Sequence, residues 1–269
     1  MTTSHAFRSR APAVAGMFYP GDPDALRVAV RSYLDHAPRS TGRAPKALIV
    51  PHAGYAYSGP IAASAYATLA GASGTIRRVV LAGPTHRVAV VGIAIPSSIG
   101  FDTPLGRIPL DAAMLDRLAQ LPGVGVSDQA HRLEHSLEVQ LPFLQMTLDS
   151  FELVPLAVGM ASAELVAKVL ETAWGGPETL IVVSTDLSHY HPYEEARRID
   201  GATSAQLALL AGNITGEQAC GCHALNGLLL AAARRGMTER TLDVRNSGDT
   251  SGDRAAVVGY GAFALHEPE

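Results

Sequence analysis

Four short runs of apolar residues constrain most strongly what this chain can fold into. They are bounded by glycine, proline or charged residues and cover positions 47–50, 79–82, 153–158 and 180–184. Runs of this length without polar alternation are typical of central strands in a sheet whose two faces are both covered by helices. A weaker run at 91–95 predicts a fifth strand.

Helical patterns lie between the apolar runs. Capping or polar residues followed by apolar stripes predict helices at 58–69, 111–121, 134–148, 163–174, 194–210 and 219–235. Near the end of the chain, residues 241–244 and 255–265 are predicted to be strands. This alternation favours an α/β fold with a central mixed, largely parallel sheet flanked by helices.

Length and composition favour a single domain. The chain has 269 residues, of which 47% are hydrophobic and 17% are charged, and this is enough to form one full core. No segment is long and polar enough to be a linker, so we expect one domain over residues 1–269. Residues 1–45, which include APRSTGRAP at 37–45, are expected to be an irregular N-terminal lead-in that packs on this domain.

Charge and cysteine content narrow the class of protein. The formal net charge of −4 argues against a nucleic-acid-binding surface, which normally needs a dense basic patch. The first residues lack the apolar core of a secretory signal, and no run approaches the roughly 18 apolar residues that cross a bilayer. The two cysteines, Cys220 and Cys222, exclude a disulfide framework. We therefore expect a reduced, cytoplasmic location, with neither nucleic acid nor membrane as a partner.

Three of the four main apolar runs end in loops with titratable side chains. KALIVPHAGY brings His52, RRVVLAGPTH brings His86, and TLIVVSTDLSH brings Asp186 and His189, whereas FELVPLAVGM ends without a titratable group. Ligands of open α/β sheets bind outside the carboxyl ends of the strands, so these side chains converge if the strands are parallel neighbours. Converging imidazoles suit a transition metal. A single histidine would more often cap a strand or bind a carbonyl, but three at equivalent positions favour a site.

Two residues of EQACGCHALNGLL are further ligand candidates. Cys220 and His223 lie three residues apart at the start of a predicted helix, so both could face one side of its first turn. A helix N-terminus lowers the pKa of a thiol and favours the thiolate that metals bind. A small buried hydrophobe, or a Cys-x-Cys redox pair with Cys222, explains Cys220 equally well.

The segment DQAHRLEHSLEVQLPFLQ concentrates polar side chains within a predicted amphipathic helix. They are His131, Glu134, His135, Glu138 and Gln140. The leucines at helical spacing, Leu133, Leu137 and Leu141, are expected to face the core. HRLEH lacks the HExxH order of zinc proteases, so His135 and Glu138 are expected to support metal ligands or to line a substrate pocket. A solvated, capped helix start explains the same residues equally well.

Taken together, these segments are similar to the Memo family, which in bacteria is known as AmmeMemoRadiSam system protein B. RAPAVAGMFYP, PHAGYAYSGP, LAGPTHRV, EHSLEVQLPFLQ, STDLSHY and CGCHA occur in the order typical of that family and spread over most of the chain. The resemblance implies a fold related to the class III extradiol dioxygenases, which cleave catechols with Fe(II) held by two histidines and a carboxylate.

The resemblance also implies roles for individual residues. His52 and His86 would be the two histidine ligands, and Cys220 would take the place of the carboxylate. His189 would be the catalytic acid/base, with Asp186 beside it. The residues that support the ligands or line the substrate pocket would be Tyr55, His135, Glu138 and His223.

A cysteine ligand changes the chemistry that this resemblance implies. A thiolate is softer than a carboxylate and can itself be oxidised, so Cu or Zn would fit as well as Fe(II), which is the metal we expect first. Members of the family are known with iron or copper. Cys222, a second thiol beside the site, favours copper binding or disulfide formation.

Two functions from different classes follow. The favoured one is a metal-dependent oxidoreductase with a dioxygenase-like non-haem iron site that acts on a small substrate, for example an aromatic one. The alternative is a non-enzymatic module that binds a metal, a peptide or a protein on the same fold, whereas a hydrolytic zinc site has no matching motif. Asp186 and His189 favour chemistry, because a structural metal would prefer four protein ligands. The resemblance also implies two protein partners, a radical-SAM protein and a third small protein of the same system.

Overall fold

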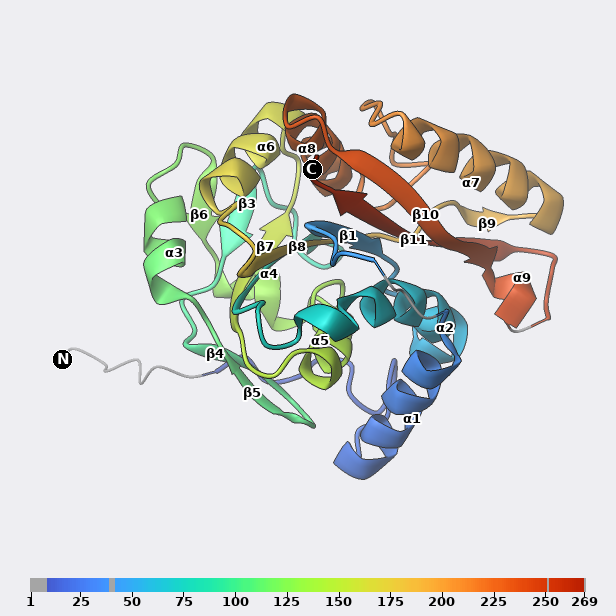
Figure 1. Cartoon of the computed structure of the whole chain (residues 1–269), viewed down its shortest axis with the longest axis horizontal. Helices are drawn as coiled ribbons and strands as arrows, with labels where there is room; N and C mark the ends of the chain where they lie inside the picture. The colour runs from blue at the N-terminus through green and yellow to red at the C-terminus, as the bar shows by residue number, and fades with distance from the viewer. Residues whose placement is uncertain (1–8, 39–41, 251, 269) are drawn as a thin grey trace.

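The computed structural model describes residues 9–38, 42–250 and 252–268, and a mixed sheet forms its centre (Figure 1). In spatial order the main strands are β10 (Thr238–Asn246), β11 (Val257–His266), β1 (Ala47–Val50), β8 (Thr179–Ser184), β2 (Arg78–Pro84), β7 (Glu152–Val158), β3 (Ile93–Ile95) and β6 (Val124–Val126). A short strand, β9 (His189–His191), pairs with β11. A separate hairpin consists of β4 (Gly100–Thr103) and β5 (Gly106–Pro109).

The four main apolar runs form the parallel centre of this sheet. β1, β8, β2 and β7 are adjacent and parallel, and nearly all of their residues are buried. β11 pairs antiparallel with β1, and β3 pairs antiparallel with β7, so the sheet is mixed but largely parallel at its centre. The predicted fold class is therefore confirmed. Because β1, β8 and β2 run in the same direction, their carboxyl ends meet at one edge of the sheet.

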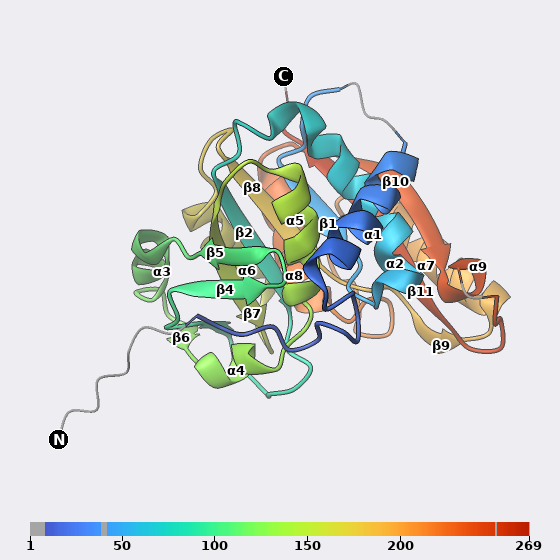
Figure 2. The same cartoon turned by 90° about the horizontal axis from the view of Figure 1, so that it is seen from below.

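Helices cover both faces of the sheet, as the apolar character of its strands requires. They are α1 (Pro23–His36), α2 (Tyr55–Tyr66), α3 (Ala112–Leu118), α4 (Asp128–Arg132), α5 (Leu141–Thr147), α6 (Ala163–Thr172), α7 (Tyr193–Ala208), α8 (Cys222–Arg234) and α9 (Ser247–Thr250), with the 3₁₀ turns η1 (Ala67–Ala72) and η2 (Glu138–Gln140). Helices α1, α2 and α5 pack together on one face, whereas α6 packs on α8 and α7 packs on β10 and β11 (Figures 1 and 2). Within the described residues, no helix has the length and apolar character needed to span a membrane.

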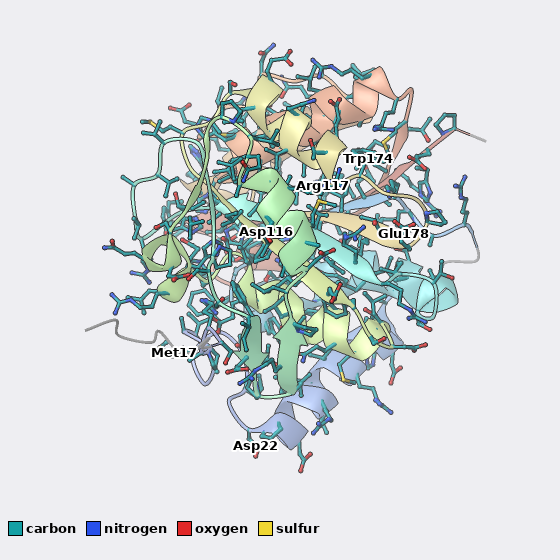
Figure 3. All side chains as sticks on the ribbon, turned by 90° about the vertical axis from the view of Figure 1, so that its left-hand side faces the viewer. Met17, Asp22, Asp116, Arg117, Trp174 and Glu178 are labelled. Atoms are coloured by element: carbon teal, nitrogen blue, oxygen red, sulfur yellow. The ribbon has the colours of Figure 1, made fainter. Side chains whose placement is uncertain are left out.

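The expected irregular lead-in contains a regular helix, α1. Asp22, labelled in Figure 3 at the start of this helix, caps it by accepting a hydrogen bond of 2.9 Å from the backbone N–H of Ala25. Pro23 occupies the first turn. Leu26 and Val30 are fully buried, so the segment packs on the domain as expected. An aspartate followed by proline is a helix-start pattern that accounts for the difference. Residues 1–8 and 39–41 of the lead-in lie outside the described residues.

The helix predicted at 134–148 is also wrong in its first part. Glu134 and His135 lie in a non-helical loop between α4 and η2, and α5 begins only at Leu141. The Glu134 side chain accepts the backbone N–H groups of His135 and Ser136, and these bonds replace helical ones. Leu133 is 53% exposed and does not face the core, although Leu137 and Leu141 do.

Candidate metal centre

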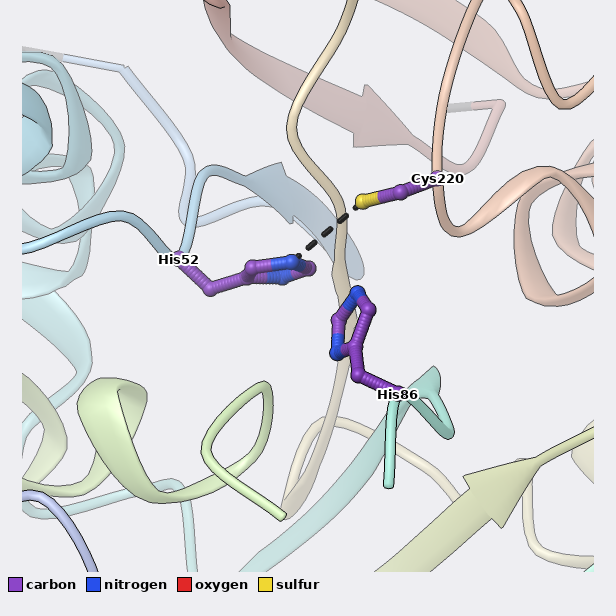
Figure 4. A group of neighbouring side chains, drawn as sticks. All are labelled: His52, His86 and Cys220. Carbon is purple, nitrogen blue, oxygen red and sulfur yellow. Dashed lines mark hydrogen bonds between the residues drawn. The ribbon is translucent and has the colours of Figure 1, made fainter. Parts of the chain in front are cut away.

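Three side chains from different parts of the sequence converge at the carboxyl edge of the sheet. His52 follows β1, His86 follows β2, and Cys220 precedes α8. Figure 4 shows the three side chains pointing toward one another, and one ligand atom from each lies within 4.8 Å of the others. The Nε2 atom of His52 is 3.3 Å from the Sγ atom of Cys220, and the imidazole centroids of His52 and His86 are 5.2 Å apart. The structure thus brings together the three residues predicted as metal ligands.

A buried hydrogen-bond network fixes the tautomer of His52. Its Nδ1 atom lies 2.9 Å from the Oγ atom of Ser184, which itself donates to the carbonyl of Ser136 and accepts from the Gln140 amide. Because the Ser184 proton is used on Ser136, the Nδ1 atom of His52 must be the donor. Its Nε2 atom therefore carries a lone pair toward Cys220. Burial and the charge of His86 also lower the pKa of His52 to about 3, so this imidazole is neutral at pH 7.

A carboxylate fixes the tautomer of His86. The Nδ1 atom of His86 donates to an oxygen of Glu134 over 2.9 Å, which leaves its Nε2 atom with the lone pair. Burial alone would raise the pKa of Glu134, but hydrogen bonds from His86 and from the Ser136 backbone lower it to about 2. The side chain of His86 is 30% exposed, whereas that of His52 is buried. The centre therefore opens to solvent on the His86 side.

The glycine of CGC lets Cys220 approach the strand edge. The backbone N–H of Gly221 donates to the Oγ1 atom of Thr185 over 2.8 Å. A Cβ atom at Gly221 would lie 2.7 Å from the Cβ atom of Thr185, so a larger residue would push Cys220 away from His52. Burial, followed by the charge of Asp186, raises the pKa of the Cys220 thiol to about 12. The thiol is therefore protonated in the metal-free protein at neutral pH.

The two predicted catalytic residues occupy different positions around this centre. Asp186 is buried and accepts the backbone N–H of His52 over 2.7 Å, with its other oxygen 4.0 Å from the His52 Nε2 atom. Burial raises the pKa of Asp186, against the opposing effect of the His52 backbone N–H. His189 is partly buried on β9, where its residue pairs with Val258 of β11. Asp186 is thus bonded to the candidate ligand His52, rather than being only the partner expected for His189.

A second carboxylate holds the loop that carries His189. Asp200 of α7 is buried and accepts the backbone N–H of Ser188 over 3.0 Å. The Ser188 carbonyl in turn accepts the backbone N–H of Gly259 over 2.8 Å. Asp200 and β11 therefore position the loop. Nothing in the sequence near STDLSHY indicates that Asp200, which lies in α7, is its partner.

The four residues expected around the ligands divide into two groups. His135 joins the centre, since its ring stacks on His86 with centroids 4.8 Å apart and lies 5.6 Å from the His52 ring. Tyr55 packs with other core aromatic rings, and its hydroxyl donates to the Val139 carbonyl. The structure therefore places Tyr55 in the core and not on a pocket wall.

Glu138 and His223 form their contacts away from the candidate metal centre. Glu138 is fully buried and accepts hydrogen bonds from Arg10, Tyr19 and two backbone N–H groups of the N-terminal segment. His223 is exposed and its Nδ1 atom bonds the Ala161 carbonyl, so it does not face the centre with Cys220. Cys222 is the first residue of α8 and packs in the hydrophobic core.

Glu134, Ser184 and Gln140 are the supporting residues that sequence reasoning missed. Glu134 directly precedes His135 in EHS, but its partner His86 is 48 positions away, and Ser184 is 132 positions from His52. Ligating histidines usually donate their second N–H to a carboxylate or another acceptor, and here both do. Two oriented lone pairs and a thiol therefore fit a transition metal that accepts nitrogen and sulfur ligands.

Metal binding is expected to release about one proton at pH 7, because a thiol with a pKa near 12 must ionise while His52 is already neutral. Metal affinity should consequently rise with pH, by about tenfold for each unit between pH 6 and 8. Calorimetric titration with Zn²⁺ in buffers of different ionisation enthalpy measures the number of protons directly. A release of no proton would contradict the assignment of Cys220 as a ligand.

Replacing Glu134 by glutamine is expected to weaken metal binding by about 10–100-fold, because the imidazole of His86 loses the carboxylate that orients it. The matched control is Glu138→Gln, a buried carboxylate four residues later that contacts no ligand. Competition with a chelating dye measures both dissociation constants. Equal dissociation constants for Glu134→Gln and Glu138→Gln would show that Glu134 does not support the centre.

Comparisons with known proteins show which proteins this chain resembles. The family model described as Memo-like protein matches residues 10–264 of the chain. A MEMO1 family protein of Methanopyrus kandleri is 35% identical, over 95% of this chain and 98% of its own length. A MEMO1 family protein of Aquifex aeolicus is also 35% identical, over 94% and 97% respectively. Among solved structures, the uncharacterized protein JW3007 from Escherichia coli K12 superposes with a TM-score of 0.54 at 15% identity, covering 82% of this chain and 100% of that one. The last similarity concerns the fold alone.

Proposed function

Because this chain belongs to the Memo family, we propose that it is a metal-dependent oxidoreductase with Fe(II) held by His52, His86 and Cys220. Its substrate would be a small molecule, and an aromatic one with oxygen donors would suit the metal. The observation that supports this proposal best is the convergence of three ligand atoms, from His52, His86 and Cys220, at an edge where the His86 side chain is partly exposed. Three ligands leave coordination positions for substrates, whereas a structural metal would be closed by a fourth.

When bound, Fe(II) would supply redox chemistry and Lewis acidity. The protein residues have separate tasks around it. Ser184 and Glu134 keep the two imidazoles oriented, and Asp186 holds the backbone of His52 in place. His135, stacked on His86, offers a wall for a planar substrate. His189 would accept or donate the substrate proton through its imidazole, on a loop that Asp200 holds.

The alternative function is a metal-binding module without turnover. The cysteine ligand favours it, because a thiolate with two imidazoles also suits Cu(I) or Zn(II). These metals would make the same three residues a storage or transfer site.

The deciding experiment combines metal analysis with turnover. We expect anaerobically purified protein to contain near-stoichiometric iron and to consume O2 when a catechol is added. In His189→Ala, iron should remain and O2 consumption should fall by about 100-fold or more, the range for loss of a general acid/base. In His52→Ala, both iron and O2 consumption should be lost.

Other outcomes separate the two functions. Stoichiometric copper or zinc, with no O2 consumption after iron reconstitution, would favour the binding module. If His189→Ala consumed O2 at the wild-type rate, His189 would not be the acid/base of the reaction.

A further inference from the structure

Three non-glycine residues in the described part of the chain have a left-handed backbone conformation. Tyr190, Leu210 and Asn213 have φ angles of 61°, 49° and 71°. Asparagine tolerates this conformation better than most residues, and the Leu210 side chain packs against the hydrophobic core. Neither reason applies to Tyr190, because this residue is bulky and 76% exposed.

Tyr190 is the extra residue of a β-bulge between β9 and β11, which lie side by side in Figure 1. His189 pairs with Val258 and His191 pairs with Val257, so Tyr190 has no partner of its own on β11. Glycine is the usual residue at a bulge position with a left-handed backbone, and bulges beside active sites often re-aim a side chain. The sequence therefore has a tyrosine where glycine would fit the backbone better.

Hydrogen bonds on both sides of the bulge hold this conformation. The backbone N–H of Ser188 donates to the Asp200 carboxylate over 3.0 Å, and the Ser188 carbonyl accepts the N–H of Gly259 over 2.8 Å. Beyond the bulge, the N–H of Tyr193 donates to the Arg254 carbonyl over 3.2 Å. Strained residues persist where the surrounding structure fixes them, and they cluster at functional sites.

The side chain of Tyr190 contributes little to the fold. Within the described residues, its hydroxyl has no hydrogen bond, and its ring belongs to neither hydrophobic cluster. The ring contacts the imidazole of His189, with centroids 5.8 Å apart and an interplanar angle of 67°. Packing therefore does not explain why a tyrosine occupies this strained position, and a role in binding does.

The Tyr190 ring lies beside the candidate metal centre, on the side of His189. Burial and the charge of His86 lower the pKa of His52, and the charge of His189 lowers it further. Burial raises the pKa of Asp186, against the opposing effects of the His52 backbone N–H and of the charge of His189. His189 is therefore close to both residues, and the exposed ring of Tyr190 lies on its outer side, toward solvent.

We infer that Tyr190 determines substrate specificity, because its ring stacks on a second planar group of the substrate, outside the ring that binds the metal. This role rests on the proposed function, since both groups would belong to one substrate at one site. The substrate class is then a catechol, or a similar oxygen chelator, that carries a second aromatic or conjugated ring. A bound ring would cover the exposed face of Tyr190, and the fixed bulge would hold that face in place before binding.

Thermal unfolding of the metal-free protein tests whether the ring supports the fold. Tyr190→Gly should raise the unfolding midpoint by about 2 °C, because glycine adopts a positive φ without strain. The matched control is Leu210→Gly, which relieves the same kind of strain but should lower the midpoint, since the Leu210 side chain packs on the core. A midpoint lowered as much in Tyr190→Gly as in Leu210→Gly would show that Tyr190 is structural, and would overturn the inference.

The binding test uses esculetin, a fluorescent catechol fused to a second planar ring, on the full-length protein loaded with Zn²⁺. Catechol itself, which lacks the second ring, is measured by its displacement of esculetin. We expect Tyr190→Ala to weaken esculetin about 3–10-fold and to leave catechol unchanged. Tyr190→Phe keeps the ring and should bind both compounds as the wild type does.

Three results would contradict stacking on Tyr190. They are an equal affinity of esculetin for wild type and Tyr190→Ala, an equal loss of both compounds in Tyr190→Ala, and no saturable binding of esculetin to the wild type. A loss in Tyr190→Phe as large as in Tyr190→Ala would assign the effect to the hydroxyl and would overturn stacking as well.

O2 consumption by the iron-loaded protein separates this inference from the proposed function. Catechol-dependent O2 consumption, together with esculetin binding that does not depend on Tyr190, would overturn the role of Tyr190 alone. No O2 consumption, together with binding that does depend on Tyr190, would overturn the oxidoreductase and support Tyr190 as an aromatic-binding residue.

Discussion

Replacing Cys220 by alanine is expected to weaken iron binding by on the order of 100-fold or more, since even residues that only support a ligand contribute 10–100-fold. The Sγ atom is 3.3 Å from the Nε2 atom of His52, and within the described part of the chain no other thiol belongs to the group formed with the two imidazoles. The remaining imidazole pair would bind a divalent metal only weakly. Metal content after anaerobic purification and the dissociation constant for Fe(II) both measure the effect.

Cys222→Ala is the matched control for this variant. It removes a thiol two positions away that packs in the core. Among the described residues, this thiol belongs neither to the group of His52, His86 and Cys220 nor to the other group of potential metal ligands, His86, Glu134 and His135. We expect wild-type iron content in Cys222→Ala, with at most a small loss of stability. If Cys222→Ala lost iron as completely as Cys220→Ala, the metal would bind both thiols and the three-residue centre would be wrong.

Replacing Glu138 by alanine is expected to lower the free energy of unfolding by about 3–5 kcal/mol, the cost of leaving a buried charge without its partner. The carboxylate is fully buried and lies 2.6 Å from the Arg10 guanidinium, which is also buried. It accepts further bonds from the Tyr19 hydroxyl and from the backbone N–H groups of Ala13 and Val14. Glu138 therefore attaches the N-terminal segment to the 131–138 loop through four hydrogen bonds. Urea unfolding of the metal-free protein measures the loss.

A double-mutant cycle with Arg10→Ala tests the pairing. Arg10→Ala/Glu138→Ala should lose clearly less stability than the sum of the single variants, because neither charge is then left alone. Additive losses would show that the two side chains do not act as a pair.

The strands were predictable because burial on both faces leaves a plain pattern in the sequence. β1 was predicted with the bounds it has in the structure, and β8 was predicted within one residue of its start. The helix α1 was missed although Asp22 and Pro23 indicate its start, because residues 1–45 were treated as one irregular segment together with APRSTGRAP at 37–45. The early part of the 134–148 helix was predicted from leucine spacing, but the Glu134 carboxylate binds the local backbone instead.

The candidate ligands were predictable for a topological reason. A histidine that follows a central parallel strand must lie at the carboxyl edge of the sheet, so His52 and His86 could be assigned without knowing their neighbours. Cys220 could not be assigned in this way, since it precedes a helix, and only the resemblance to the Memo family selected it. The structure then brought it to 3.3 Å from His52.

The sequence by itself determined the α/β class, the parallel centre of the sheet and the edge at which the histidines gather, because apolar runs and loop positions are local properties of a chain. Only the tertiary structure decided which polar side chain supports which ligand. Ser184 orients His52, and Glu134 orients His86. Glu138 binds the N-terminal segment instead of supporting a ligand. These partners are 48 to 132 positions apart, and no short-range pattern records a contact formed when distant loops pack at one sheet edge.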